Sequence, residues 1–514
     1  MQTAKVEQLK KGETTHSWSE EEKEAFTDYI NNTLNKDRDI GSRLPINPKD
    51  NSLFSSVHDG LLICKLINDA IPETIDERVL NKGTNLNNFK IHENQAVAIN
   101  SAKAIGCNII NIGAQDLMDG APHLVLGLIW QIIRIGLFSR INLVNHPELY
   151  RLLEPGETIE DLLKLPIDQI LLRWVNYHLK NAGWDKRVNN FSGDIKDASA
   201  YTVLLAQIAP KHCNRDPLKE GDLTRRAELM LQNAEKLGCR KFVSPRDVVR
   251  GNQKLNLAFV ANLFNTWPAL EPLEEEIVII EETREEKQFR NWMNSLGVDP
   301  FVNNLYSDLS DGLVLLQLFD KVEPGIVNWN QVNKNKPLTT WKALENDNYA
   351  VALGKQLKFS LVGIQGKDIM DGNKTLTLSV VWQLMRHHVI SILQRLGGGN
   401  KITDNEIVNW ANDKVRSAGK SSSMASFKDP SLKNSVFLID LIDAVRPGAA
   451  DYALVAHADD EATLLLNAKY AVSLARKIGG AVFALPEDIV EVKNKMIMTF
   501  VATIMAIDLG HHGH

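Results

Sequence analysis

The stretch LVLGLIWQIIRIGLF, residues 124–138, decides the fold. Wound at 3.6 residues per turn it is apolar on almost every side, so it predicts a helix that lies inside a domain. Only Gly127, Gln131 and Arg134 interrupt it, and their spacing of four and then three residues places them along one side of the helix. We call these three residues the stripe, and we expect them to face solvent, another domain or a partner.

The stretch has a copy farther along the chain. Several short motifs recur at a constant offset of 252 residues, among them Asp-Gly at 59 and 119 and the Trp-Gln pair inside the stretch. One constant offset at several places indicates a tandem duplication of roughly 250 residues. Both tryptophans lie on the apolar side of their helices, so we expect core packing for them. The matched residues are Trp130 with Trp382, Gly127 with Ser379, Gln131 with Gln383 and Arg134 with Arg386.

Each half repeats again, more faintly. At four places an Asp or Asn stands 13 residues before a proline, with a helical apolar pattern between them. The Asp or Asn fits a helix N-cap, and the proline marks where that helix has already ended. Four units of odd and even type follow, each with four main helices in about 110 residues, which predicts an all-α fold. The N-cap residues are Asp59, Asp197, Asp311 and Asn434, and the first helices carry a central aromatic at Tyr29, Trp174, Trp292 and Trp410.

The domain boundaries follow from this pattern. Between the halves lies PALEPLEEEIVIIEETREEK, residues 268–287, which contains two prolines and is strongly acidic. It is either a soluble spacer or a regulatory clamp along a basic surface. We expect a polar N-terminal tail at 1–17, domains at 18–143, 157–267, 287–396 and 401–509, an acidic linker at 268–286 and a tail at 510–514.

Composition narrows the possible partners. The formal net charge is −6 over 514 residues, whereas a large phosphate-binding surface normally leaves a basic excess, so we expect no nucleic-acid partner. Arg134 interrupts the longest apolar run before it reaches the ~20 residues that span a bilayer, so we expect no membrane insertion. The four cysteines are far apart and form no C-x-x-C pair. They are typical of reduced thiols in an intracellular protein.

No catalytic, cofactor or metal motif is complete. The sequence Ala418-Gly419-Lys420-Ser421 imitates the end of a phosphate-binding loop, but Lys414 stands where the first glycine is required. The nearest approach to a calcium loop, NKDRDIGSRLPI at 35–46, has isoleucine where the loop needs its glycine and its bidentate glutamate. We therefore expect no enzyme, no cofactor and no metal site.

Two motifs are recognisable. E-x-x-A-F-x-x-Y-x-N at 22–31 and DLMDG-x-x-x-LVLGLIWQII at 116–133 resemble the first and last helices of calponin-homology domains, which are actin-binding modules. Four such domains in two odd-even tandems resemble the fimbrin (plastin) family of actin-bundling proteins. Carried over from that resemblance, the actin-binding segments are Glu24 to Leu34, Leu124 to Ile135 and Gln169 to Lys180, then Lys287 to Leu296, Leu376 to His388 and Glu406 to Arg416.

The resemblance implies that one monomeric chain, in the cytoplasm at the actin cytoskeleton, ties two actin filaments together through two actin-binding domains. The alternative is a calponin-homology scaffold that binds microtubules or a signalling partner, with only one half binding actin. A solvated helix face remains the other explanation for Arg173 and Lys180. The candidate actin contacts are Phe26, Tyr29, Gly127, Gln131, Arg134, Arg173, Lys180, Ser379, Gln383 and Arg386.

Overall fold

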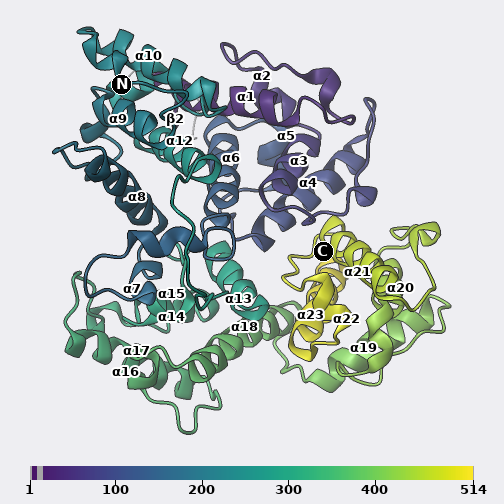
Figure 1. The fold of residues 1–514 in the computed structure, drawn as a ribbon. Coiled ribbons are helices and arrows are strands. Elements are labelled where there is room, and N and C mark those ends of the chain that lie inside the picture. The colour runs from purple at the N-terminus through teal and green to yellow at the C-terminus, as the bar shows by residue number, and fades with distance from the viewer. Residues whose placement is uncertain (1–2, 8–15, 513–514) are drawn as a thin grey trace. The chain divides into compact units, whose positions relative to one another are not determined.

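The computed structural model describes residues 3–7 and 16–512, and helices dominate it (Figure 1). This confirms the all-α fold. By their mutual contacts the residues fall into two compact units. The first is Met1–His58, Asp69–Ile71 and Asp116–Glu282; the second is Asp59–Asn68, Pro72–Gln115 and Thr283–His514.

The first unit holds the first and last helices of the first repeat and the whole second repeat. Its helices are α1 (Glu20–Leu34), α2 (Ser52–Ser56), α5 (Ala114–Met118), α6 (Pro122–Ser139), α7 (Ile159–Leu163), α8 (Ile167–Asn181), α9 (Ser199–Ile208), α10 (Leu223–Lys236), α11 (Pro245–Arg250) and α12 (Gln253–Thr266). Short 3-10 turns are η1 (Gly41–Arg43), η3 (Pro147–Leu152), η4 (Gly193–Ile195) and η5 (Asp216–Lys219).

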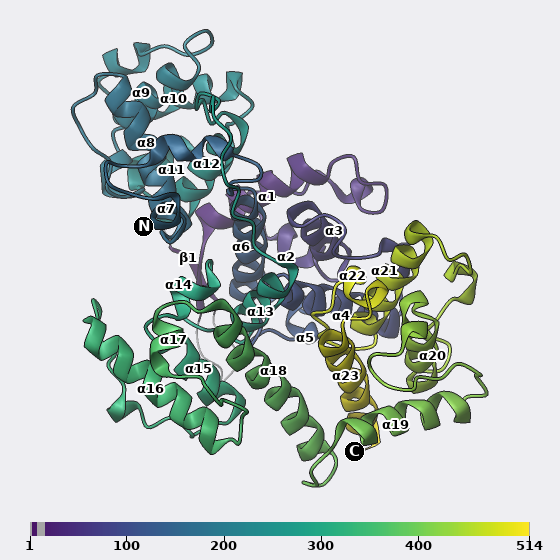
Figure 2. The same cartoon turned by 60° about the horizontal axis from the view of Figure 1, so that its bottom comes forward.

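The second unit holds the third and fourth repeats together with α4 and all but the last two residues of α3 from the first. Its helices are α3 (Leu61–Ala70), α4 (Asn88–Ala104), α13 (Arg284–Ser295), α14 (Leu305–Leu309), α15 (Leu313–Val322), α16 (Thr340–Gln356), α17 (Gly366–Met370), α18 (Lys374–Leu396), α19 (Asp404–Ser417), α20 (Val436–Val445), α21 (Glu461–Lys477), α22 (Pro486–Val490) and α23 (Asn494–His512). Its 3-10 turns are η2 (Glu77–Val79), η6 (Trp329–Gln331), η7 (Pro430–Asn434) and η8 (Tyr452–Leu454). Helices α18 and α23 lie against each other (Figure 2).

A short hairpin was not expected from the sequence. Strands β1 (Thr3–Glu7) and β2 (His16–Ser19) pair antiparallel, where the polar composition predicted only a tail. The second strand ends on Trp18, which is buried and meets Phe54 edge-on with ring centroids 5.2 Å apart. One buried aromatic therefore fixes the end of a segment whose other residues carry no apolar pattern.

The four predicted N-cap residues do bond the starts of their helices, but they stand one residue early: in the last three repeats the N-cap itself is Ala198, Gly312 or Ser435. In each repeat the Asp or Asn side chain accepts a hydrogen bond from the backbone N–H two residues later, over 2.9 to 3.1 Å. The residue between them has a positive φ of 60° to 81°, a backbone conformation that favours glycine. Two repeats place glycine there and two do not. The four residues are Gly60, Ala198, Gly312 and Ser435.

A second fourfold feature is an asparagine clamp. Two residues after the central aromatic of each first helix, an asparagine amide both donates to and accepts from one backbone residue of the following loop, over 2.7 to 3.0 Å. The clamp ties that loop to the helix in every repeat. An aromatic-x-Asn pattern in the sequence carries this signal. The pairs are Asn31 with Ile46, Asn176 with Val188, Asn294 with Val302 and Asn412 with Met424.

Helix α6 lies inside its repeat, as the opening stretch predicts. Leu128 and Ile129 have no exposed surface. By length and composition alone α6 could cross a membrane, contrary to our expectation, but half of it is buried within the protein. The expectation of core packing for its tryptophan is wrong, because Trp130 is only half-buried and stacks at 6.1 Å on Phe26. Its copy Trp382 is half-buried too, with the Lys495 ammonium 5.5 Å from the ring centroid.

The acidic linker follows the connection between the first two repeats. Arg151 on η3 donates to the backbone carbonyls of Glu271 and Pro272 over 3.3 and 2.9 Å, and the Tyr150 hydroxyl donates to that of Val278 over 3.1 Å. A basic residue does therefore meet the linker, through its main chain. Helix α13 begins at Arg284, three residues before the expected boundary.

Candidate functional site

Phe26 on α1 is a core residue. It has no exposed surface, so it cannot touch a partner while the repeat is folded. The prediction that Phe26 contacts actin is therefore wrong. The apolar spacing of the first-helix motif points this side chain inward. Ser19 caps α1, its hydroxyl accepting from the Glu22 N–H over 3.2 Å.

Tyr29, one turn farther along α1, joins two repeats. Its ring stacks on Phe242 of the second repeat with centroids 4.8 Å apart, and its hydroxyl donates to Asp69 over 3.1 Å. Burial, and then the negative charge of Asp69, raise the pKa of Tyr29 to about 12. A ring packed in this way positions the second repeat against α1.

The first turn of α1 strengthens the same junction. It carries the glutamates at 20–22, and three basic residues of the second repeat pair with two of these and with Glu24 in the next turn. Burial of Glu21 raises its pKa, but the hydrogen bond from Ser19 and the charge of Arg246 outweigh it, so the pKa lies below its usual value. Sequence reasoning missed these pairs, although the acidic run facing a basic helix was a usable signal. The pairs are Glu21 with Arg250 at 2.6 Å, Glu24 with Arg246 at 3.0 Å and Glu22 with Lys254 at 3.5 Å.

The stripe on α6 is half-buried along its length, so of the three expected neighbours (solvent, another domain or a partner) open solvent alone does not describe it. Arg134 lies over the Phe138 ring at 5.4 Å, and burial lowers its pKa, partly offset by the charge of Asp168 on α8. Gly127 keeps open space around it, because a Cβ there would meet no atom within 4 Å. The stripe is therefore a half-buried strip of α6 beside the second repeat, whose α12 packs on α6.

Helix α8 supplies two of the candidates, and they differ. Lys180 is exposed and available. Arg173 is not on a solvated face, because its side chain is 17% exposed and pairs with Glu157 over 2.5 Å. Between them the buried Trp174 donates from its indole nitrogen to the Pro268 carbonyl over 2.8 Å, which anchors the start of the acidic linker.

In the second half, α13 is largely covered. Phe289 and Trp292 are buried, and α4 packs along the helix within the same unit. At its start Arg284 donates to Asp488 of the fourth repeat over 2.8 Å. The segment carried over as Lys287 to Leu296 thus offers few side chains to a partner.

The second stripe, on α18, is held in place by hydrogen bonds. Gln383 accepts from the Ser360 N–H over 2.6 Å and donates to the Ser360 carbonyl over 3.1 Å, and its amide also reaches the Ser379 hydroxyl at 3.2 Å. Arg386 has 40% of its side chain exposed and pairs with Asp404 on α19 over 2.6 Å. The structure thus brings Ser379, Gln383 and Arg386 onto one accessible side of α18.

Residues 35–46, the nearest approach to a calcium loop in the sequence, bury two isoleucines. Ile40 and Ile46 occupy the positions where glycine and glutamate are required, and both side chains are buried. They anchor the loop to the core of the first repeat.

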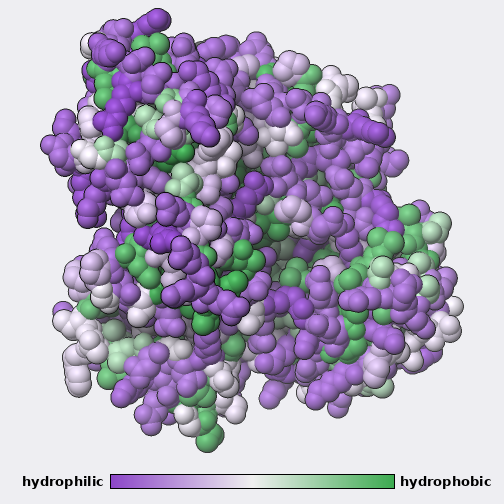
Figure 3. Space-filling view, viewed as in Figure 1, coloured by the Kyte–Doolittle hydropathy of each residue, from purple (hydrophilic) through white to green (hydrophobic). Residues whose placement is uncertain are grey.

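Most of the surface seen in Figure 3 is hydrophilic, with hydrophobic residues in separate patches.

The calponin homology (CH) domain model matches the chain four times, at 20–137, 165–269, 283–390 and 401–509. Fimbrin of Dictyostelium discoideum is 61% identical over 500 residues, which cover 96% of this chain and 82% of that protein. Plastin-3 of Homo sapiens is 54% identical over 513 residues, covering 96% and 80%. The crystal structure of the actin-crosslinking core of Schizosaccharomyces pombe fimbrin is similar with a TM-score of 0.83 and 47% identity, covering 95% of this chain and 100% of that one.

Proposed function

The chain belongs to the calponin homology family, in its fimbrin and plastin group, and from this premise we propose that it binds actin filaments and crosslinks them into bundles. Two actin-binding heads in one chain bind the filaments, and each head consists of an odd and an even repeat. One observation carries the proposal: the helix α6, which bears the stripe, has a copy in α18. In both helices an arginine interacts electrostatically with an aspartate on the first long helix of the next repeat.

Bivalency makes weak single contacts sufficient. A head with a Kd on the order of micromolar contributes about 8 kcal/mol. Once one head is bound, the other is held near a second filament at an effective concentration of up to about millimolar. The crosslink therefore persists without a strong site on either head.

We assign the candidate contacts two roles, and their burial and their contacts inside the chain support this assignment. The exposed or accessible ones touch the filament: Lys180 in the first head and Ser379, Gln383 and Arg386 in the second, with Gly127 and Gln131 at the rim of the first stripe. Tyr29, Arg134 and Arg173 position the heads through their contacts inside the chain.

Further parts of the proposal rest on the family. We propose the domain boundaries given from the sequence, with the third domain beginning at Arg284 instead of Lys287. We also propose a monomeric chain in the cytoplasm at the actin cytoskeleton, and no catalytic role, nucleic-acid partner or membrane insertion. A scaffold that binds microtubules or a signalling partner is not favoured, because the similar proteins are fimbrins, plastins and an actin-crosslinking core.

Two centrifugation speeds test the proposal. We expect the intact chain to pellet with actin filaments at high speed and to carry them into the low-speed pellet as bundles. A chain that stays in the supernatant at high speed would refute filament binding. A chain that pellets only at high speed would refute crosslinking.

A further inference from the structure

Asp347, in the middle of α16, is a buried acid without a donor. Its side chain has no exposed surface, and neither carboxyl oxygen has a hydrogen-bond partner among the described residues. The other buried acids of the second unit are satisfied. Asp488 accepts from Arg284 over 2.8 Å, Asp440 from Tyr452 over 2.7 Å, and Asp508 from Lys414 over 2.9 Å. A lone buried carboxylate is costly, so Asp347 needs an explanation.

The backbone around Asp347 is packed tightly on two sides. A Cβ on Gly312 would lie 3.0 Å from the Asp347 nitrogen, and a Cβ on Gly366 would lie 2.9 Å from the Asp347 carbonyl carbon. Both neighbours must therefore be glycine for α16 to lie so close. The position that carries the buried acid is also the point where α16 meets the starts of α15 and α17.

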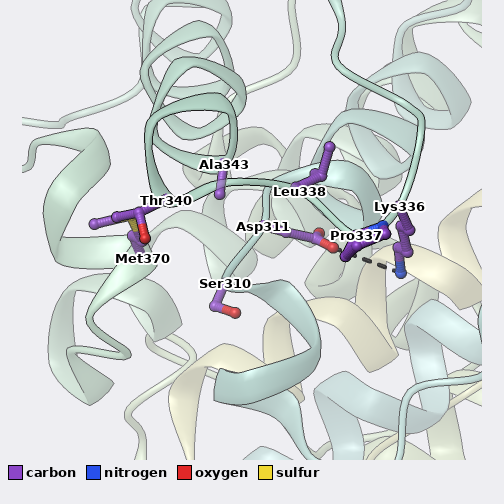
Figure 4. Close-up of a pocket in the computed structure, with 8 residues that line it drawn as sticks. All are labelled: Ser310, Asp311, Lys336, Pro337, Leu338, Thr340, Ala343 and Met370. Carbon is purple, nitrogen blue, oxygen red and sulfur yellow. Dashed lines mark ion pairs between the residues drawn. The ribbon is translucent and has the colours of Figure 1, made fainter.

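The charged groups nearby do not relieve the acid. Asp311, before α15, acts on it with the same sign of charge, and Lys336 pairs with Asp311 over 3.5 Å instead. These two side chains line a cavity of about 320 Å³ beside Ala343, one turn before Asp347 (Figure 4). On α17, Lys367 is exposed and Asp368 accepts from the Gln365 N–H over 2.8 Å.

These surroundings decide the protonation state. Burial, and then the charge of Asp311, raise the pKa of Asp347 to about 9. An aspartate in an unfolded chain titrates near 3.9. Between these values the folded third repeat holds a proton that the unfolded chain has released. The free energy of unfolding therefore falls as pH rises from about 4 to about 9. Each pH unit lowers the equilibrium constant for folding about tenfold.

The other repeats lack this group. Asp347 directly follows an asparagine, Asn346, whose amide bonds to Asn333. The same asparagine recurs in each repeat, and the residue after it cannot titrate in the other three. Those residues are Gln95, Ala234 and Ala468.

We propose that Asp347 is a proton-operated switch of the third repeat. The repeat resists local unfolding while the carboxyl carries its proton, and it unfolds locally more easily when the proton leaves. Because α16 packs on α17, and α17 on α18, the loosened region includes the helix that bears Gln383 and Arg386. The switch goes beyond filament binding and does not depend on it.

Hydrogen exchange of the full chain tests the switch. Amide protection of α16 to α18 is measured from pH 6 to 8 in the natural chain and in Asp347→Asn, which keeps the shape but cannot titrate, so that comparison at each pH cancels intrinsic exchange. We expect the protection ratio of natural chain to variant to fall about tenfold per pH unit in α16 to α18. In α20 and α21 of the fourth repeat we expect the ratio to stay constant.

Two further variants make the result decisive. Asp347→Ala carries the residue of the even repeats and cannot titrate either. It replaces Asp347→Asn as the reference if the asparagine variant folds poorly, and its amide protection should have the pH profile expected for Asp347→Asn. Glu345→Gln, an exposed acid on the same helix, should keep the slope of the natural chain. The proposal is overturned if the natural chain and both Asp347 variants share one pH profile.

Discussion

Arg386 on α18 forms an ion pair with Asp404 on α19 across 2.6 Å. Its duplicate, Arg134 on α6, lies in the field of Asp168 on α8, and each aspartate stands six residues before the buried or half-buried tryptophan of its helix. In both halves an arginine on the last helix of an odd repeat interacts with an aspartate on the first long helix of an even one, as an ion pair in the second half and through the aspartate's charge in the first. The duplication thus preserved an interface between repeats as well as the repeats themselves.

The two arginines should differ when replaced. Arg386→Glu removes an exposed pair, which contributes about 0 to 1 kcal/mol, so the melting temperature should hardly change. Arg134→Glu places a second acid beside Asp168 in a half-buried position and should destabilise the chain by more than Arg386→Glu does. Calorimetry at pH 7 and low salt gives the comparison. Equal losses of stability in the two variants would show that Arg134 and Arg386 are equally exposed.

Two glycines on α6 should respond in opposite directions to alanine. A Cβ on Gly127 meets nothing within 4 Å, so Gly127→Ala should stabilise the helix by about 0.5 to 1 kcal/mol. A Cβ on Gly136 would lie 2.9 Å from the Cα of Ala70, so Gly136→Ala should cost about 1 to 3 kcal/mol. Urea unfolding measures both. A drop in stability for Gly127→Ala would contradict the open space seen there.

Two tryptophans separate core from surface. Trp174 is fully buried and bonded to Pro268, so Trp174→Ala should cost about 3 to 5 kcal/mol. Trp341 is 69% exposed on α16, so Trp341→Ala should change stability by no more than about 0.5 kcal/mol. Thermal unfolding followed by circular dichroism tests the pair, and similar losses at the two sites would contradict the packing described here.

Arg151 should protect the acidic linker. Arg151→Ala removes two hydrogen bonds to the Glu271 and Pro272 carbonyls, so limited proteolysis between 273 and 282 should become faster. Lys164→Ala, which changes an exposed basic residue of the first unit, serves as the control. Unchanged cleavage in Arg151→Ala would mean that the linker is held by other contacts.

The fold could be predicted from the sequence because its signals are local and repeated. The side chains of Asp59 and Asp311 bond to backbone N–H groups two residues away, and an apolar helix such as α6 has to be buried. The β1–β2 hairpin could not be predicted, because what fixes its end is a contact of Trp18 with Phe54, 36 positions away.

The candidate site was predictable only in part. Helical periodicity placed Gln383 and Arg386 on one side of α18, where the structure has them. It could not show that Arg173 pairs with Glu157 or that Tyr29 packs on Phe242, because those partners come from other elements. Phe26 was misplaced for another reason: a family motif marks residues that matter, and here the residue matters to the core.

The most direct test of the crosslinking claim is low-speed sedimentation of actin filaments with the chain cut at an engineered protease site in the acidic linker, beside the same chain uncut. We predict that the uncut chain carries filaments into the low-speed pellet. The cut chain should lose this bundling while both fragments still pellet with filaments at high speed. Bundling that survives the cut with separated fragments, or a fragment that binds no filament, would contradict two heads in one chain.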